Sequence, residues 1–331
     1  MQQDVRRKPP ADSGETNPRF YTPAREIDWQ PAMVNISVVL PTYGGDDPDA
    51  LREAIESIVS QTRVPDELVI VRDGPVPETN QTIIDNFESK YSFVRHVPLA
   101  ENQGRALARK VGVERCQGDV VAMMDADDLC VPTRLERQET YLQNNPEVDV
   151  VGAQLLEFDP ENGEKLGVRT LPTDHEEIRD LAKTRSPVSQ STVIFKRTAA
   201  LDIGNYRDVD RMEDYGLWVR MLVNGARFAN IPEVLVKART GEKMYERRAG
   251  WEYAREELRL QREFVALGFI SPLQALRNVA FRVPIRFVPN AIRAYVYETL
   301  FRTEPSVGIP ETSTVSVGHE TDVSSDETKD R

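Results

Sequence analysis

The order of apolar runs in the first 125 residues constrains the fold more than any other feature of the chain. Runs of strand length lie at 36–40, 67–71, 94–97 and 119–124. Stretches with apolar residues at the helical period lie between them, at 51–59, 82–91 and 105–116. Strands that are continuously apolar are typical of a parallel sheet with helices on both faces. The sequence therefore predicts an α/β fold with a mostly parallel sheet flanked by helices.

Polar residues follow three of these strands directly. We expect Pro41 to end the first strand, Asp73 to follow the second, and residues 125–128 to follow the fourth. Ligands of such sheets bind at the carboxyl ends of the strands, so these residues should converge on one crevice. The sequence has neither a G-x-G-x-x-G nor a G-K-[ST] loop. A dinucleotide dehydrogenase and a P-loop kinase are therefore disfavoured.

The segment Asp125-Ala126-Asp127-Asp128 places three carboxylates within four residues. Their mutual repulsion is costly unless a cation neutralises it. Oxygen ligands of this kind suit Mg²⁺ or Mn²⁺, which proteins often bind through one or two carboxylates together with substrate phosphates. The alternative is an Asp-rich turn that caps the next helix.

Composition excludes several classes of protein. The net charge of the 331 residues is −12, which argues against nucleic acid as a partner. We see no apolar signal segment, and no apolar run approaches the roughly 20 residues that cross a bilayer. The two cysteines suit a reducing compartment, so we expect a cytoplasmic protein. Of the 42 basic residues 33 are Arg, which with the acidic excess suggests a halophilic source or a GC-rich genome.

Four regions follow from composition along the chain. We expect a flexible polar arm at 1–32, a globular domain at 33–240, a helical extension at 241–302 and a disordered acidic tail at 303–331. Within the extension, residues 272–302 carry five Arg and one Glu among apolar residues. This pattern predicts a segment on an anionic membrane surface, at the inner face of the cell membrane. An ordinary helical subdomain is the alternative.

An ordered series of motifs connects these regions. The series consists of VVLPTY (38–43), IVSQT (58–62), LVIVRDG (68–74), NQGRALAR (102–109), MDADD (124–128) and EDYGLW (213–218). In this order the motifs resemble the family 2 glycosyltransferases, inverting sugar transferases of the GT-A fold. Three further segments resemble the amylovoran-type branch, which builds exopolysaccharides; they are 187–197, 215–225 and 244–251.

The resemblance implies roles on the donor side of the crevice. Tyr43 and Asp73 occupy the positions that hold the nucleotide base, through ring stacking and a carboxylate that accepts the uracil N–H. Pro41 and Thr42 line the same wall. Arg109 occupies the position of a basic residue that faces the nucleotide and its diphosphate.

The resemblance also implies the metal ligands and the catalytic base. Asp127 matches the principal ligand of Mn²⁺ or Mg²⁺, and Asp125 matches the supporting carboxylate, which also contacts the nucleotide sugar. Asp214 matches the base that deprotonates the acceptor hydroxyl. Gln190, Glu213 and Trp218 would lie on the acceptor side. From the residues alone, Glu213 and Asp214 can instead be first-turn charges of a helix, and Trp218 can be a core residue.

Two positions depart from the family pattern. Arg72 stands where many members carry a second acid, and Ser189-Gln190-Ser191 stands where the amylovoran-type branch has Asn-His-Pro. The first departure leaves the base site to Asp73, and the second leaves the acceptor preference open.

The expected function is inverting transfer of a sugar from a nucleotide-diphosphate sugar, a UDP-sugar, to a growing glycan or a polyprenyl-phosphate-linked acceptor. The product would be a polysaccharide or a glycoprotein glycan. The alternatives are a sugar-phosphate nucleotidyltransferase and a non-catalytic carbohydrate-binding scaffold on the same fold.

Overall fold

A computed structural model of the chain describes residues 34–209, 211–240 and 250–289. They belong to a single compact unit that begins at Met33. The predicted arm at 1–32 and the predicted acidic tail at 303–331 lie outside the described residues.

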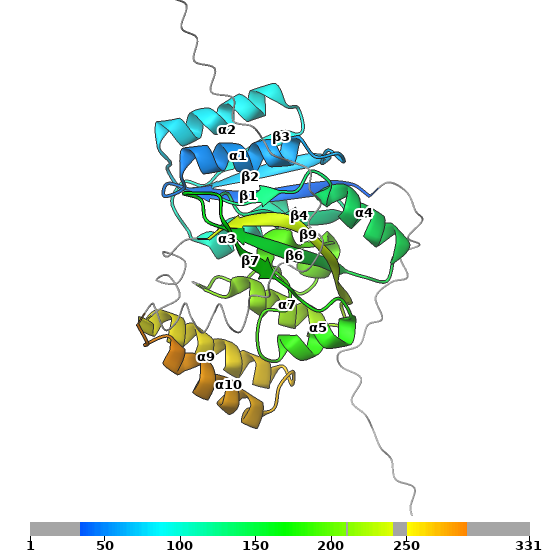
Figure 1. Cartoon of the computed structure of the whole chain (residues 1–331), viewed down its shortest axis with the longest axis vertical. Helices are drawn as coiled ribbons and strands as arrows, with labels where there is room; N and C mark the ends of the chain where they lie inside the picture. Colours follow the sequence, from blue (N-terminus) through cyan, green and yellow to red (C-terminus); the bar gives the residue numbers. More distant parts are fainter. Residues whose placement is uncertain (1–33, 210, 241–249, 290–331) are drawn as a thin grey trace, which may run out of the picture. The chain divides into compact units, whose positions relative to one another are not determined.

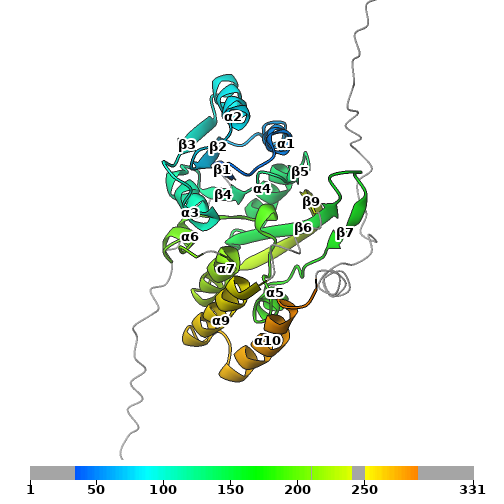
Figure 2. The same ribbon diagram turned by 90° about the vertical axis from the view of Figure 1, so that its left-hand side faces the viewer.

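The first four strands form the parallel sheet that the apolar runs predict (Figure 1). They are β1 (Ile36–Tyr43), β2 (Glu67–Asp73), β3 (Val94–Pro98) and β4 (Val120–Met123), in the spatial order β3-β2-β1-β4. The helices between them are α1 (Pro48–Val59), α2 (Glu78–Lys90) and α3 (Arg105–Arg115). In the turned view, α1 and α2 cover one face of this sheet and α3 covers the other (Figure 2).

The prediction that Pro41 ends the first strand is wrong. β1 continues to Tyr43, and Pro41, Thr42 and Tyr43 pair with β2 up to Asp73. β1 pairs with β4 only as far as Val39, so Pro41 lies where one side of the strand has no partner. A proline has no N–H to donate, and it is tolerated where the ladder does not need one.

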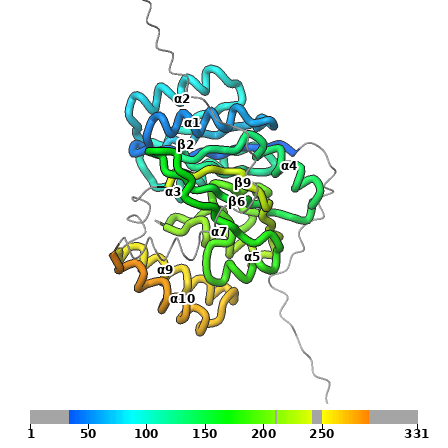
Figure 3. Tube along the Cα trace, viewed as in Figure 1, coloured from blue at the N-terminus to red at the C-terminus, as the bar shows by residue number. Residues whose placement is uncertain are grey.

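The remaining strands make the sheet mixed rather than mostly parallel. They are β5 (Leu129–Cys130), β6 (Val150–Phe158), β7 (Lys165–Arg169), β8 (Ile194–Lys196) and β9 (Phe228–Arg239). β6 and β9 run parallel and side by side although they are far apart in the sequence (Figure 3). The pairs β4–β8, β6–β8, β6–β7 and β5–β9 are antiparallel.

Helices of the second half cover the same face of the sheet as α3 (Figure 2). They are α5 (His175–Ala182), α6 (Arg197–Leu201), α7 (Glu213–Val223) and α9 (Gly250–Ala266); α4 (Arg134–Asn144) and the 3₁₀ turn η1 (Gln190–Thr192) lie beside β6, β8 and β9. Trp218 of α7 is fully buried, with its ring edge-to-face against Phe195 and Phe228. Leu260 and Phe264 of α9 belong to the same core cluster, so this helix packs on the core of the domain.

The predicted C-terminal helical extension is present in the described part as α9 and α10 (Pro272–Ile285). Glu257 of α9 is fully buried, and its carboxylate lies 3.0 Å from Arg282 and 3.6 Å from Arg286. Asn278 donates a hydrogen bond to the carbonyl of Lys183, which fixes α10 to the body. Within 34–209, 211–240 and 250–289, every helix is too short or too polar to cross a bilayer.

Candidate active site

The end of β1 forms one wall of the predicted crevice. Tyr43 is 45% exposed, whereas Thr42 is buried and Pro41 is half-buried. The Thr42 hydroxyl and the Tyr43 backbone N–H both donate to the carboxylate of Asp46, at 2.9 and 3.0 Å. A Cβ atom on Gly45 would lie 2.6 Å from the Tyr43 ring, so a side chain at this position would have to displace the ring. The wall therefore presents an exposed aromatic ring whose backbone is held by Asp46.

Asp73 ends β2 but does not present a free carboxylate. It is buried, and its two oxygens accept the backbone N–H groups of Gln103 and Gly104 at 2.7 and 2.9 Å. Gly104 has φ of +91°, a conformation that side chains other than glycine rarely adopt. Asp73 therefore fixes the loop that precedes α3. Arg72, which replaces the second acid, donates to the side chain of Gln81 at 2.9 Å.

The acidic loop 125–128 connects β4 to β5, at the carboxyl end of β4. Asp127 is exposed, and its backbone carbonyl accepts a hydrogen bond from Arg239 at 2.6 Å. Asp125 is partly exposed and accepts one from Arg109 at 2.6 Å. Asp128 is buried. Asp125 and Asp127 act electrostatically on Asp46, which binds the end of β1, so the acidic loop lies near this strand end.

The charges of this loop fit a divalent cation. Burial raises the pKa of Asp46 to about 6, and repulsion from Asp127 and Asp125 adds to the rise. Burial and the same two neighbours raise the pKa of Asp128 well above its usual value. The pKa of Asp125 is lowered, because attraction to Arg109 and Arg105 outweighs burial. Oxygen donors with excess negative charge are the ligands that Mg²⁺ and Mn²⁺ take, and Asp127 and Asp125 would hold such an ion.

A buried ion-pair chain links this loop to α7. The side chain of Arg109 is 3% exposed; one Nη binds Asp125 and the other makes a short contact with Oε1 of Glu213. The Nε of Arg105 binds the same oxygen of Glu213 at 2.8 Å. The prediction that Glu213 faces the acceptor is wrong, because its carboxylate is 2% exposed and paired with two arginines. Arg109 likewise has both Nη groups engaged within the protein.

Asp214 follows Glu213 in the first turn of α7, after Met212 in a left-handed conformation with φ of 58°. Asp214 is half-buried. Burial raises its pKa, and the neighbouring Glu213 raises it further, against the lowering effect of Arg109. A carboxylate with a raised pKa is a better proton acceptor. The position of Asp214 therefore fits a general base.

Two further predicted acceptor residues differ in their placement. Gln190 in η1 is half-buried and donates to the hydroxyl of Tyr206 at 2.8 Å, while its Oε1 has no hydrogen-bond partner in the part of the chain described. Trp218 is 0% exposed and lies in the core. The prediction of Trp218 on the acceptor side is therefore wrong, and the alternative, a core residue, is correct.

Sequence reasoning missed three residues that hold the candidate site together. Asp46 holds the end of β1, Arg105 pairs with Glu213, and Arg239 binds the Asp127 carbonyl. Arg105 had a usable signal, because it lies four residues before Arg109 and so shares its helix face. The sequence holds no such signal for Asp46 and Arg239, because the conformation of the segments that they contact depends on the fold.

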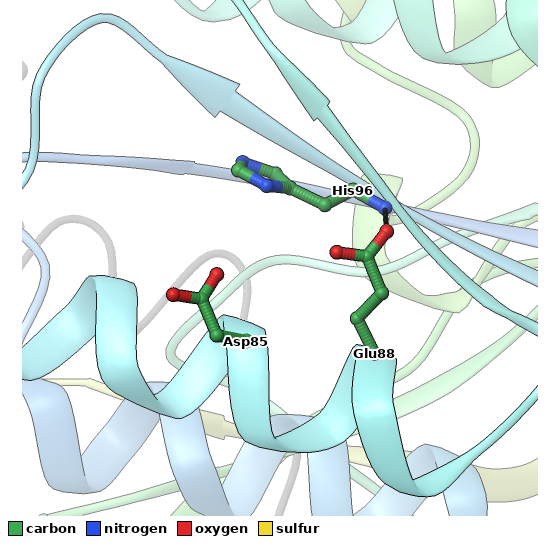
Figure 4. A group of neighbouring side chains, drawn as sticks. All are labelled: Asp85, Glu88 and His96. Carbon is green, nitrogen blue, oxygen red and sulfur yellow. Dashed lines mark hydrogen bonds between the residues drawn. The ribbon is translucent and has the colours of Figure 1, made fainter.

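A second group of metal-binding side chains lies apart from this loop, on α2 and β3 (Figure 4). Asp85, Glu88 and His96 place one potential ligand atom each within 4.8 Å of the others. Glu88 accepts the backbone N–H of His96 at 2.8 Å, and Asp85 accepts a hydrogen bond from Gln81. Both carboxylates are exposed. We interpret the group as a contact between α2 and the edge strand.

The sheet, the acidic loop at the end of β4 and the carboxylate on the facing helix together define a GT-A type glycosyltransferase. The chain matches the family model "Glycosyl transferase family 2" over residues 37–204 and belongs to that family.

Curated relatives place it in the amylovoran-type branch. It is 35% identical to the amylovoran biosynthesis glycosyltransferase AmsE of Erwinia amylovora, over 79% of this chain and 97% of the relative. It is 32% identical to the UDP-Gal:alpha-D-GlcNAc-diphosphoundecaprenol beta-1,3-galactosyltransferase of Escherichia coli, over 80% of this chain and 96% of that protein.

A solved structure has the same fold. The mannosyltransferase PcManGT of Pyrobaculum calidifontis, in complex with GDP-Man and Mn²⁺, aligns with a TM-score of 0.54 and 16% identity. The alignment covers 81% of each chain.

Proposed function

We propose that the protein transfers a sugar, with inversion, from a UDP-sugar to a growing glycan or a lipid-diphosphate-linked acceptor in polysaccharide synthesis. The observation that carries the proposal is the ion-pair chain that links the acidic loop to α7, next to Asp214. It ties a metal-binding loop to a general base. The two relatives support the donor and acceptor classes, because their names state amylovoran synthesis, UDP-Gal and a diphosphoundecaprenol acceptor.

The donor would bind along the ends of β1 and β4. The exposed Tyr43 ring offers a face on which the base can stack, and Pro41 and Thr42 form the wall behind it. Asp73 would act by holding the loop at Gln103 and Gly104 beside the base. Asp127 and Asp125 would hold Mn²⁺ or Mg²⁺. A bound divalent ion neutralises the diphosphate and so makes it a better leaving group.

The acceptor would enter from the side of α7 and η1. Asp214 removes the proton of the attacking hydroxyl, whose oxygen forms a bond to the anomeric carbon. The bond from that carbon to the phosphate oxygen breaks, and its electron pair leaves with the nucleotide diphosphate. A single displacement of this kind inverts the anomeric centre. Gln190, whose amide donates to the Tyr206 hydroxyl, would accept a hydrogen bond from an acceptor hydroxyl through its Oε1.

We also propose that α10 lies against an anionic membrane surface. Its outward stripe exposes Leu273, Leu276 and Phe281 by 65% to 76%, with Arg277 on the same side. Residues 272–289 contain no acid in a chain of net charge −12. Such a face suits a membrane that carries a lipid-linked acceptor.

The membrane proposal is tested by sedimentation of the protein with anionic vesicles. We expect the wild type to sediment with the vesicles and the double substitution Leu276→Ser with Phe281→Ser to abolish this. Sedimentation that these changes leave unaffected would refute the proposal. The predicted remainder of this segment, 290–302, lies outside the described residues.

The transferase proposal is tested by Mn²⁺-dependent binding and slow hydrolysis across a panel of UDP-, GDP- and dTDP-sugars, at low and high salt. We expect one donor class to bind and Asp127→Ala to abolish this binding. Asp85→Ala is the matched control, because it removes an exposed aspartate from the other group of potential metal ligands. Loss of binding in Asp85→Ala, with Asp127→Ala unaffected, would place the metal elsewhere and refute the site.

Two outcomes would favour the alternatives. Pyrophosphate release from a nucleoside triphosphate and a sugar phosphate would indicate a nucleotidyltransferase. A folded protein that binds no nucleotide sugar, but does bind glycans, would indicate a scaffold.

A further inference from the structure

Two arginines on the same face of α3, one helical turn apart, differ in how far their charges are satisfied. Arg109 has a side chain 3% exposed, and its two Nη atoms bind Glu213 and Asp125. Arg105 has a side chain 56% exposed and binds Glu213 through Nε alone. Across residues 34–209, 211–240 and 250–289, no hydrogen-bond partner is found for either Nη atom of Arg105. The two Nη groups of Arg105, called the fork below, are therefore available as hydrogen-bond donors to a ligand.

The position of this fork is fixed by the protein. The Nε of Arg105 lies 2.8 Å from Oε1 of Glu213, the same oxygen that binds Arg109. Arg109 in turn binds Asp125 of the acidic loop. The positive charge of Arg105 acts on both ends of the crevice, since it lowers the pKa of Asp125 and opposes the rise in the pKa of Asp214. Arg105 is therefore joined through Glu213 and Arg109 to the acidic loop, and through Glu213 to the first turn of α7 that holds Asp214.

We propose that Arg105, rather than Arg109, is the arginine that contacts the diphosphate of the donor. The inference rests on the proposed function. A guanidinium fork binds phosphate oxygens well when its N–H groups are free. The charge of Arg109 is already balanced by two carboxylates in a buried setting, so Arg109 is a positioning residue. It holds the loop and α7 in register, whereas Arg105 meets the ligand.

The proposed contact has a consequence for the reaction. When the bond from the anomeric carbon to phosphate oxygen breaks, negative charge increases on the departing diphosphate. A positioned donor stabilises this charge more than it stabilises the bound donor sugar. Removing the fork should therefore weaken nucleotide diphosphate binding and lower turnover at saturating donor.

The test compares UDP, UMP and uridine, each with Mn²⁺, by calorimetric titration. The proteins are wild type, Arg105→Gln, Arg105→Lys and the control Arg52→Gln, which removes an exposed arginine from a surface pair with Asp49. We expect Arg105→Gln to weaken UDP binding by about 10- to 100-fold, the effect of losing hydrogen bonds to a charged group. The effect on UMP should be smaller and that on uridine absent. Arg105→Lys should restore part of the UDP affinity.

The dependence on phosphate number separates a direct contact from a structural effect. If Arg105→Gln weakens all three ligands equally, the change acts through Glu213 and the inference is wrong. If UDP binding is unchanged, the inference is also wrong. The same series with GDP, GMP and guanosine covers the other base. A folded wild type that binds none of these nucleotides would instead refute the proposed function, and with it the ground for the inference.

Discussion

The donor half of the molecule and the acceptor half reach their site by different means. In the donor half, β1 to β4 run parallel, and the site residues lie in the last positions of β1 and β2 or in the loop that follows β4. In the acceptor half, Asp214 lies at the start of α7 and Gln190 lies in the short turn η1, and contacts with other segments position both. The comparison shows that a regular sheet edge presents its candidate ligand-binding groups directly, whereas the proposed base Asp214 depends on side-chain contacts of its neighbour Glu213.

Buried polar side chains connect the two halves. Arg134 of α4 is fully buried and donates to the carbonyls of Met123 at the end of β4 and Val193 beside η1. Gln138, one turn later, donates to the carbonyl of Thr192. Buried donors and acceptors are costly when unpaired, so these bonds specify how η1 meets β4. α4 therefore fixes the position of η1 relative to the end of β4, from which the acidic loop starts.

The largest effect that tests the division into two halves is expected on turnover, from the substitution Asp214→Asn. The amide cannot accept the proton of the acceptor hydroxyl, so turnover should fall about 1,000-fold. Donor binding should persist, because Asp214 lies in the acceptor half. Turnover and Mn²⁺-dependent UDP binding are measured on the same preparations.

Asp202→Asn, at an exposed position at the end of α6, is the matched control and should leave both quantities unchanged. If Asp214→Asn abolished UDP binding as well as turnover, the two halves would not be separable. Unchanged turnover would refute the role of Asp214 as the base.

In the donor half, Tyr43→Ala is expected to have a smaller effect, and on UDP binding rather than on turnover. Loss of a base-stacking face should weaken UDP binding by about 10-fold or somewhat more, since stacking on an aromatic ring contributes roughly 1–3 kcal/mol. Turnover at saturating donor should change little. Tyr43→Phe should retain the affinity because the ring remains. Full affinity in Tyr43→Ala would show that the base binds elsewhere.

The smallest effect concerns the pH dependence of turnover. The base must be ionised, and burial together with Glu213 raises the pKa of Asp214, so activity should be lost on acidification already above the ordinary value of 3.8. Glu213→Gln removes the repulsion that contributes to this rise, so the acidic limb of the pH profile should move to lower pH. A limb that stays in place or moves upward would show that Asp214 does not set it. Arg52→Gln serves as the control for a charge change at the surface.

How far the site could be predicted from the sequence also differs between the donor half and the acceptor half. The position of the 125–128 loop could be predicted, because the buried run of β4 ends directly before it. The end of β1 could not, because Pro41 is a local strand-ending signal, whereas pairing with β2 carries the strand on to Tyr43. The placement of Glu213 could not, because a first-turn acid on a helix has the same local pattern whether it faces solvent or two arginines. Trp218 posed the same ambiguity, and only its contacts with Phe195 and Phe228 place it in the core.

The sequence by itself determined the parallel sheet, the convergence of its strand ends and the family, because these depend on local periodicity and on the order of motifs. The tertiary structure alone decided the antiparallel half of the sheet, the burial of Arg109 and the exposure of Arg105. Pairings such as β6 with β9, and ion pairs such as Arg105 with Glu213, join residues that are distant in the chain. Their geometry depends on how whole elements pack, and no local pattern encodes it.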